Sequence, residues 1–170
     1  MDQIAFQDKN YCKGNLCWVC GNDNLHGLYI KSYWDGEESV CTWTAEKHHT
    51  AGWPHVLNGG IISGIIDCHC VQTAMAASYK DRNGEEKEPS QYWFATASLK
   101  VDFLKPTPVD RPIQLRARVK ELHTQKALVT CSLYSGGVEC ARGEVLAVRV
   151  PAGIGPGMKT YYKVQYVTKQ

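Results

Sequence analysis

The sequence lacks several features that would assign it to a specialised class. It has no apolar run near the ~20 residues of a membrane helix, and no basic N-terminal region leads into an apolar stretch. The formal net charge is only +2 over 170 residues, without a dense stripe of lysine and arginine. We therefore expect no membrane and no nucleic-acid partner. The N-terminal pattern favours a cytoplasmic protein. The length and the absence of internal repeats favour one globular domain large enough for a real core.

Cysteine, in contrast, is abundant, with eight residues in the chain. The segment CWVC at 17–20 has the spacing of a redox motif or of half a zinc site. A zinc site would need further ligands, and the nearby candidates Cys12 and His26 are poorly spaced. In a reducing compartment a free thiol behaves as a small hydrophobe. We therefore expect these thiols only to pack, and we predict no metal and no cofactor.

Composition along the chain indicates three regions. Residues 1–26 are irregular in pattern, and residues 27–150 carry the periodic segments of a folded domain. Residues 151–170 are rich in glycine and proline and then aromatic, which suggests a C-terminal arm.

The periodic segments predict an α+β domain. Alternating runs at 28–34 and 39–45, separated by a DGEE turn, indicate a hairpin, and the apolar content of 59–79 indicates one long buried helix. Four further alternating runs lie at 92–104, 111–122, 126–136 and 138–150. A single helix wrapped by a curved antiparallel sheet buries both kinds of element economically.

One carboxylate interrupts the most apolar part of the chain. Asp67 lies within LNGGIISGIIDCHC at 57–70, nine residues after Asn58. The pair Gly59 and Gly60 opens the predicted helix, where unpaired backbone N–H groups can stabilise a developing oxyanion. Nine residues of helix span about 13 Å, so Asp67 is too far away to act at its own helix N-terminus.

Three segments resemble hotdog-fold thioesterases of the phenylacetate type: CWVCGNDNLHGLYI at 17–30, HHTAGWPHVLNGGIISGIID at 48–67 and ATASLKVDFLKPTP at 95–108. The resemblance covers about residues 17–150. It implies hydrolysis of an acyl-CoA thioester by a homodimer or a dimer of dimers. In that family the acid of one subunit faces the Gly-Gly pair of the other.

The resemblance also implies roles for individual residues. Asp67 would activate water or attack the thioester directly, the N–H of Gly59 would stabilise the oxyanion, and Thr96 would orient the water. Asn58 stands where the family usually has histidine. It would support the loop as a polar anchor.

Four further residues are candidates for substrate binding. Gly60 adjoins the oxyanion donor, and His49 lies in the loop that precedes it. Ser98 is a second hydroxyl, expected on the same strand face as Thr96. Lys105 is a candidate contact for the phosphates of coenzyme A.

Two other functions remain open at this point. A hotdog hydratase or dehydratase would need a histidine beside the acid. Position 58 lacks one, and His69 is expected to pack on another side of the helix. A non-catalytic protein that binds acyl-CoA or lipid would keep the fold but have no turnover, and Asn58 would then mark the lost activity.

Overall fold

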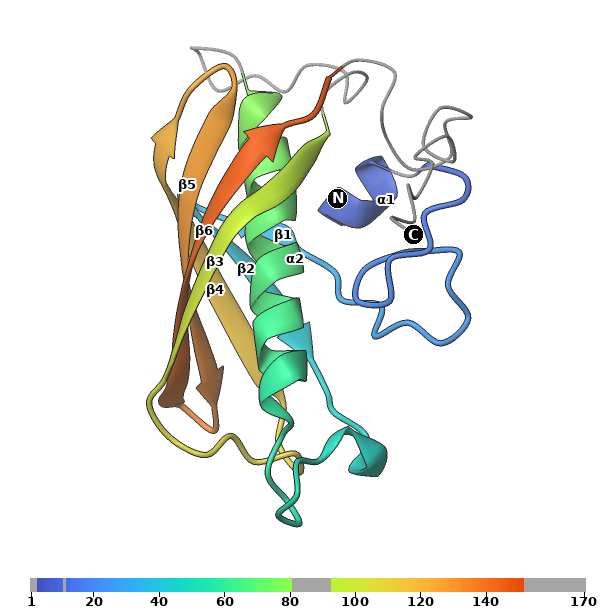
Figure 1. Cartoon of the computed structure of the whole chain (residues 1–170), viewed down its shortest axis with the longest axis vertical. Helices are drawn as coiled ribbons and strands as arrows, with labels where there is room; N and C mark the ends of the chain where they lie inside the picture. Colours follow the sequence, from blue (N-terminus) through green and yellow to red (C-terminus); the bar gives the residue numbers. More distant parts are fainter. Residues whose placement is uncertain (1–2, 11, 81–92, 152–170) are drawn as a thin grey trace, which may run out of the picture.

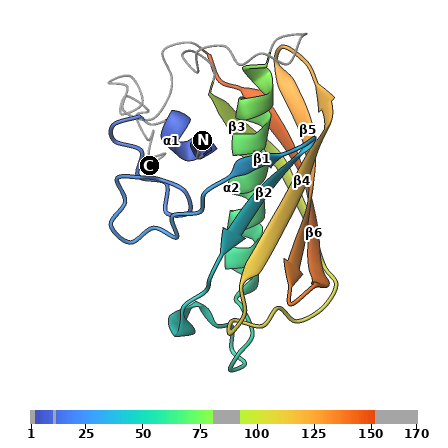
Figure 2. The ribbon, with the colours of Figure 1, turned by 180° about the vertical axis from the view of Figure 1, so that it is seen from behind.

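The computed structural model describes residues 3–10, 12–80 and 93–151. One antiparallel sheet of order β1-β2-β4-β5-β6-β3 curves around a single long helix, as Figures 1 and 2 show from opposite sides. The strands are β1 (Tyr33–Asp35), β2 (Glu38–Trp43), β3 (Phe94–Phe103), β4 (Ile113–Leu122), β5 (Lys126–Ser135) and β6 (Val138–Arg149). The helices are α1 (Phe6–Lys9), the 3-10 turn η1 (Lys47–His49) and α2 (Gly59–Ser78). The predicted α+β hotdog architecture is confirmed.

The predicted hairpin and the four later strands are present. β1 and β2 pair antiparallel across a turn in which Gly36 has a φ of +62°, a conformation that favours glycine. β1 is shorter than expected because residues 28–32 pair with the N-terminal segment instead: Leu28 N–H donates to Trp18 O, and Phe6 N–H donates to Ser32 O. Most of the proposed arm at 151–170 lies outside the described residues.

Helix α2 is the core of the molecule. Ile62, Ile65 and Ile66 are buried on the concave face of the sheet. A Cβ at Gly143 on β6 would overlap Ile66 Cγ2, so this glycine lets the helix lie close to the strands. By length and composition α2 could cross a membrane, but 56% of its most apolar window is buried inside the molecule. It is therefore the core helix of this domain.

The N-terminal segment is more ordered than its sequence suggested. It contains the four-residue helix α1, which corrects the prediction of an entirely irregular segment. The Phe6 side chain is buried, and its ring centroid lies 5.1 Å from that of Trp34 on β1. Burial of this ring and the hydrogen bonds between Gln7 and Ser32 dock α1 beside the sheet. Such contacts are too local to produce a periodic pattern.

His69 is a buried structural residue, as expected. Its ring nitrogens lie 2.8 Å from Ser32 Oγ and 3.3 Å from Ser39 Oγ, and the side chain has no exposed surface. Desolvation lowers the pKa of His69 to about 4. The folded protein therefore keeps this imidazole neutral at physiological pH.

This burial predicts an acid-sensitive fold. The unfolded chain takes up a proton near pH 6.5, whereas folded His69 does so only near pH 4. Stability is therefore fully present above about pH 6.5 and falls as the pH drops towards 4. The full difference between the two pKa values corresponds to roughly 3.5 kcal/mol, of which about 3 kcal/mol is lost by pH 4, where half of the folded molecules carry the proton. Urea unfolding between pH 7.5 and 4 measures it, and His69→Gln should flatten the pH dependence. Equal slopes for the two proteins would contradict this account.

Candidate active site

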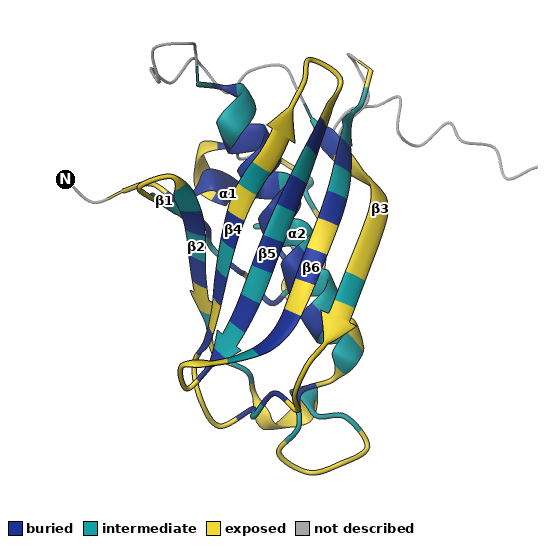
Figure 3. Cartoon of the chain, turned by 90° about the vertical axis from the view of Figure 1, so that its left-hand side faces the viewer, coloured by how far each residue is buried: buried dark blue, intermediate teal, exposed yellow. Residues whose placement is uncertain are grey.

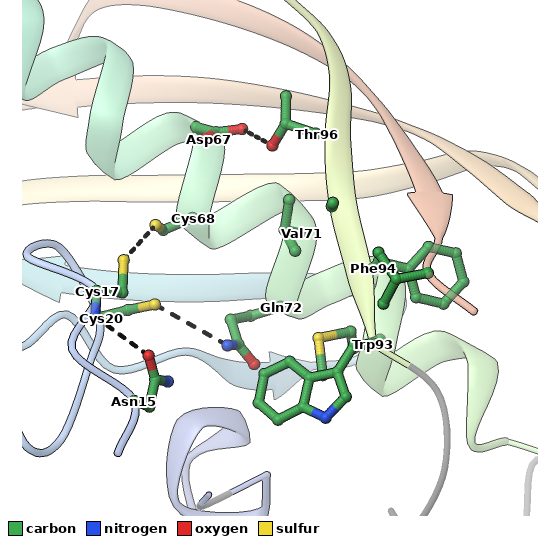
Figure 4. Close-up of a pocket in the computed structure, with 13 residues that line it drawn as sticks. Asn15, Cys17, Cys20, Asp67, Cys68, Val71, Gln72, Trp93, Phe94 and Thr96 are labelled. Atoms are coloured by element: carbon green, nitrogen blue, oxygen red, sulfur yellow. Dashed lines mark hydrogen bonds between the residues drawn. The ribbon is translucent and has the colours of Figure 1, made fainter. Parts of the chain in front are cut away.

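Asp67 and Thr96 meet across the space between α2 and β3. Thr96 Oγ1 donates a hydrogen bond of 2.5 Å to Asp67 Oδ1, and Figure 4 shows the two side chains pointing at each other. The helix supplies the acid and the edge strand supplies the hydroxyl, so the pair depends on how closely the two elements pack. The structure thus brings together two residues that were singled out separately from the sequence.

The surroundings make Asp67 harder to ionise than a surface aspartate. Burial raises its pKa, the Thr96 hydrogen bond opposes that shift, and the nearby charge of Cys17 adds to it. Desolvation is the largest cause. A partly desolvated carboxylate next to a hydroxyl donor is the chemical environment of many general bases.

A cavity of about 210 Å³ opens beside this pair. Its walls include Asp67 and Thr96, the aromatic side chains Trp93 and Phe94 and the apolar residue Met75. An apolar wall with one acid and one hydroxyl suits a ligand that has a hydrophobic body and one reactive polar group.

Ser98 does not share a face with Thr96, which corrects the expectation from the sequence. A β-bulge interrupts β3 between them: Thr96 pairs with Ala147, whereas Ser98 pairs with the adjacent residue Leu146. Adjacent residues of a strand point to opposite faces of the sheet. The single extra residue at the bulge therefore turns Ser98 away from the face that carries Thr96.

The start of α2 forms a second polar centre. Asn58 caps the helix: its Oδ1 accepts the N–H of Gly60 at 2.8 Å. The N–H of Gly60 is thereby occupied, whereas that of Gly59 has no intrahelical acceptor. Gly59 lies against the ring of Phe103 at the end of β3, where an added Cβ would be 3.4 Å from the ring carbons.

His49 and Lys105 both lie near this end of α2. His49 O accepts the N–H of Asn58 at 3.0 Å, and its Nδ1 accepts the N–H of Glu46 at 2.9 Å. Lys105 belongs to the β3–β4 loop, in which Thr107 O accepts the N–H of Leu57 at 2.8 Å. His49 thus braces the loop that leads into the glycine pair, and the side chain of Lys105 is exposed beside that loop.

The two polar centres are separate within one chain. Gly59 and Asp67 are eight residues apart on one straight helix, which is about 12 Å. The structure therefore groups Asp67 with Thr96, and it groups Asn58, Gly59 and Gly60 at the other centre.

The structure places a third group beside the acid, which sequence reasoning did not connect with it. The sulfurs of Cys17, Cys20 and Cys68 lie within 4.8 Å of one another, and the same cavity touches all three. Cys12 and His26, the candidates for further zinc ligands that lie near in sequence, are not part of this group. The sequence signals were the C-x-x-C spacing of Cys17 and Cys20 and the position of Cys68 directly after Asp67. These signals could not be combined from the sequence, because only the fold places the 17–20 loop beside Cys68.

Comparison with known proteins establishes the family. The model of the thioesterase superfamily matches residues 55–141, which span both polar centres. A thioesterase superfamily protein from Shewanella loihica is 34% identical, with 75% of this chain and 96% of that chain covered and a TM-score of 0.59. This chain belongs to the thioesterase superfamily.

More distant structures share the fold. The Escherichia coli PaaI protein from the phenylacetic acid degradation operon is 16% identical, with 74% of this chain and 82% of that chain covered and a TM-score of 0.58. A Streptococcus mutans protein solved with bound acetyl-CoA is 10% identical, with 72% of this chain and 90% of that chain covered and a TM-score of 0.58. A search among curated proteins found no match.

The Asn58 cap predicts a measurable contribution to stability. Asn58→Ala removes the acceptor of the Gly60 N–H and should lower the free energy of unfolding by about 1 kcal/mol. Asn58→Asp keeps an acceptor and adds a charge favourable to the helix N-terminus, so it should preserve stability. Urea unfolding of the three proteins provides the measurement. Equal stability of the alanine and aspartate variants would show that the cap is not needed.

Proposed function

We propose that the protein is an acyl-CoA thioesterase whose active site is completed by a second subunit. The observation that carries this proposal is the hydrogen bond between Thr96 and Asp67 at the wall of a largely apolar cavity. Membership of the thioesterase superfamily supports thioester hydrolysis as the general chemistry. The particular residues and the subunit arrangement are our proposal.

The reaction needs a nucleophile and a donor for the developing negative charge. Asp67 either removes a proton from water or attacks the thioester carbonyl itself, and Thr96 holds the carboxylate and the water in position. The carbonyl oxygen becomes negative as the tetrahedral intermediate forms. The N–H of Gly59 at the positive end of α2 stabilises that oxygen. Collapse of the intermediate then breaks the C–S bond. On the general-base route, the proton that Asp67 took from water passes to the leaving thiolate, and the carboxylic acid is released. On the nucleophilic route, the thiolate takes a proton from solvent, and a water molecule then hydrolyses the acyl–Asp67 anhydride.

The separation of the two centres is the reason for invoking a second subunit. Asp67 and Gly59 of one helix are about 12 Å apart, which is too far for both to contact one carbonyl group. β3 is an edge strand and is mostly exposed in the single chain, as Figure 3 shows. It carries the exposed apolar side chains Leu99 and Phe103. An edge of this kind is normally covered, and a second copy of β3 would cover it.

The substrate class follows from the shape and the charge of the site. The apolar wall with Trp93 and Phe94 suits an acyl or aryl group. The exposed Lys105 near Gly59 suits a phosphate of coenzyme A. A protein of the same fold binds acetyl-CoA, which is consistent with this class of ligand.

Hydratase chemistry receives less support. That reaction would need a histidine at the cleft beside the acid. None of the described residues that line the Asp67 cavity is a histidine, and His69 is enclosed between Ser32 and Ser39. A non-catalytic acyl-CoA-binding protein would hydrolyse no thioester. A thiol-release assay therefore tests this alternative as well.

Replacing the acid should abolish hydrolysis without disturbing the fold. We expect Asp67→Asn to lower kcat by about 100- to 10,000-fold, the range of general-base contributions. Thr96→Val should lower kcat by about 10- to 100-fold because it removes a hydrogen bond to a charged group, and Thr96→Ser should retain activity. The measurement is thiol release from short, medium, long and aryl acyl-CoAs, with a blank for the protein's own eight cysteines.

The outcomes separate the candidate functions. Turnover that depends on Asp67 identifies a thioesterase and its preferred acyl group. If a folded protein binds acyl-CoA but hydrolyses none of the panel, it is a binding protein. Turnover that survives in Asp67→Asn would refute the role proposed for this acid.

The shared site can be tested by mixing inactive subunits. Gly59→Pro removes the proposed donor, yet proline suits the first position of a helix, and the extended conformation of Asn58 (φ −62°, ψ 131°) accepts a following proline. Gly59→Ala keeps the N–H and is the matched control. We expect Gly59→Pro and Asp67→Asn to be inactive alone. Exchange of their subunits should restore about a quarter of wild-type activity, because half of the dimers become mixed and each has one intact site.

Two results would argue against a shared site. No recovery after demonstrated subunit exchange would mean that acid and donor act within one chain. Full activity of Gly59→Pro would mean that the N–H of Gly59 is not the oxyanion donor.

A further inference from the structure

The three cysteine sulfurs beside the cavity come from two elements far apart in the chain. Cys17 and Cys20 lie in the N-terminal segment, and Cys68 lies on α2, next to Asp67. The sulfurs of Cys17 and Cys68 are 3.6 Å apart, and all three lie within 4.8 Å of one another. Figure 4 shows the three side chains converging above the cavity. Core thiols that merely pack would normally be surrounded by carbon atoms, so this convergence calls for an explanation.

The spacing fits a tetrahedral ion better than it fits a disulfide. With a metal–sulfur distance of about 2.3 Å, two ligands of tetrahedral zinc lie about 3.8 Å apart. The distance between the Cys17 and Cys68 sulfurs is close to that value. A disulfide would require about 2.05 Å, and all eight cysteines are free thiols.

A tight turn holds Cys17 and Cys20 together: the N–H of Gly21 donates to Cys17 O at 2.8 Å, and the N–H of Cys17 donates to Asn15 Oδ1 at 3.2 Å. Gly21 closes this turn, where a Cβ would overlap the backbone of Asn15 and of Cys17. Glycine is therefore required directly after the second cysteine.

The loop is also held at a fixed place on the helix. A Cβ at Gly64 would come within 3.2 Å of Val19 Cγ2 and 3.3 Å of Trp18 Cζ2, so this glycine lets the loop approach α2 closely. Gly64 is one helical turn before Cys68 and shares its face. Val19 O also accepts the N–H of Ile30 at 3.3 Å. The three sulfurs are thus positioned by packing before any ion arrives.

We propose that Cys17, Cys20 and Cys68 form a binding site for one Zn²⁺ ion, with a fourth position that faces the cavity and is taken by water. Three thiolates and one Zn²⁺ carry a net charge of −1. The described residues supply no fourth histidine, cysteine or carboxylate ligand near the three sulfurs. The site reverses the expectation that these thiols only pack. The ion would fasten the N-terminal segment to α2 beside the acid, and the proposal does not rest on thioesterase activity.

The experiment measures metal directly. The full chain is purified with a reductant and without a metal-affinity column, and its zinc content is determined by mass spectrometry. The metal-free protein is then titrated with Zn²⁺ alone, and separately with Co²⁺, which gives a thiolate-to-metal charge-transfer band. We expect one ion per chain, the charge-transfer band and a higher Tm with Zn²⁺.

Three variants identify the ligands. Loss of a residue that only hydrogen-bonds to a metal ligand lowers metal affinity by about 10- to 100-fold. Loss of a ligand itself should cost more, so we expect Cys17→Ser and Cys68→Ser each to weaken Zn²⁺ binding by more than about 100-fold. Cys12→Ser lies outside the three-sulfur group and is the matched control, with unchanged affinity. Circular dichroism of each variant confirms that it folds, and the zinc content of the unmodified chain is independent of the variants.

Several results would overturn the proposal. These are the absence of Zn²⁺ binding by the reduced wild-type chain, unchanged affinity in a folded Cys68→Ser variant, and equal loss in Cys12→Ser. A zinc-free chain with a disulfide at Cys17 would assign the group to thiol oxidation instead. Thioesterase assays of the same variants are read separately, so failure of one proposal leaves the other intact.

Discussion

The close approach of one helix to the concave face of the sheet is the constraint on which the rest of the structure depends. Ile66 occupies the space that a side chain at Gly143 would need, so α2 lies close to β6. This contact also fixes the distance from α2 to β3, because β3 pairs with β6 along its length. A small residue at one strand position therefore lets a carboxylate on the helix reach a hydroxyl on the edge strand.

An acid within an apolar helix is costly unless its position serves a purpose. Asp67 is half-buried, accepts a hydrogen bond from Thr96 and faces a cavity, so it is neither an ordinary core residue nor an ordinary surface charge. The helix also separates this acid from the N–H of Gly59 by about 12 Å. The proposed dimer would explain both features, because Asp67 of one copy would then face Gly59 of the other.

The N-terminal segment gives the cavity one of its walls. Phe6 packs against Trp34, and the turn around Gly21 brings Cys17 and Cys20 against α2. The superfamily match begins at residue 55, so this wall lies outside the matched region. The segment thus places Cys17 and Cys20 in the wall of the same cavity as Asp67, which lies inside the matched region.

The sequence determined the features that depend on neighbouring residues. Helix α2 was predicted from its apolar content, the strands from alternation, and the unusual position of Asp67 from the residues around it. Only the tertiary structure decided which residues meet. The bulge that separates Ser98 from Thr96 depends on pairing with β6, and Cys68 joins Cys17 across 51 positions of chain. Local periodicity carries no information about such contacts, because they arise only when distant segments pack together.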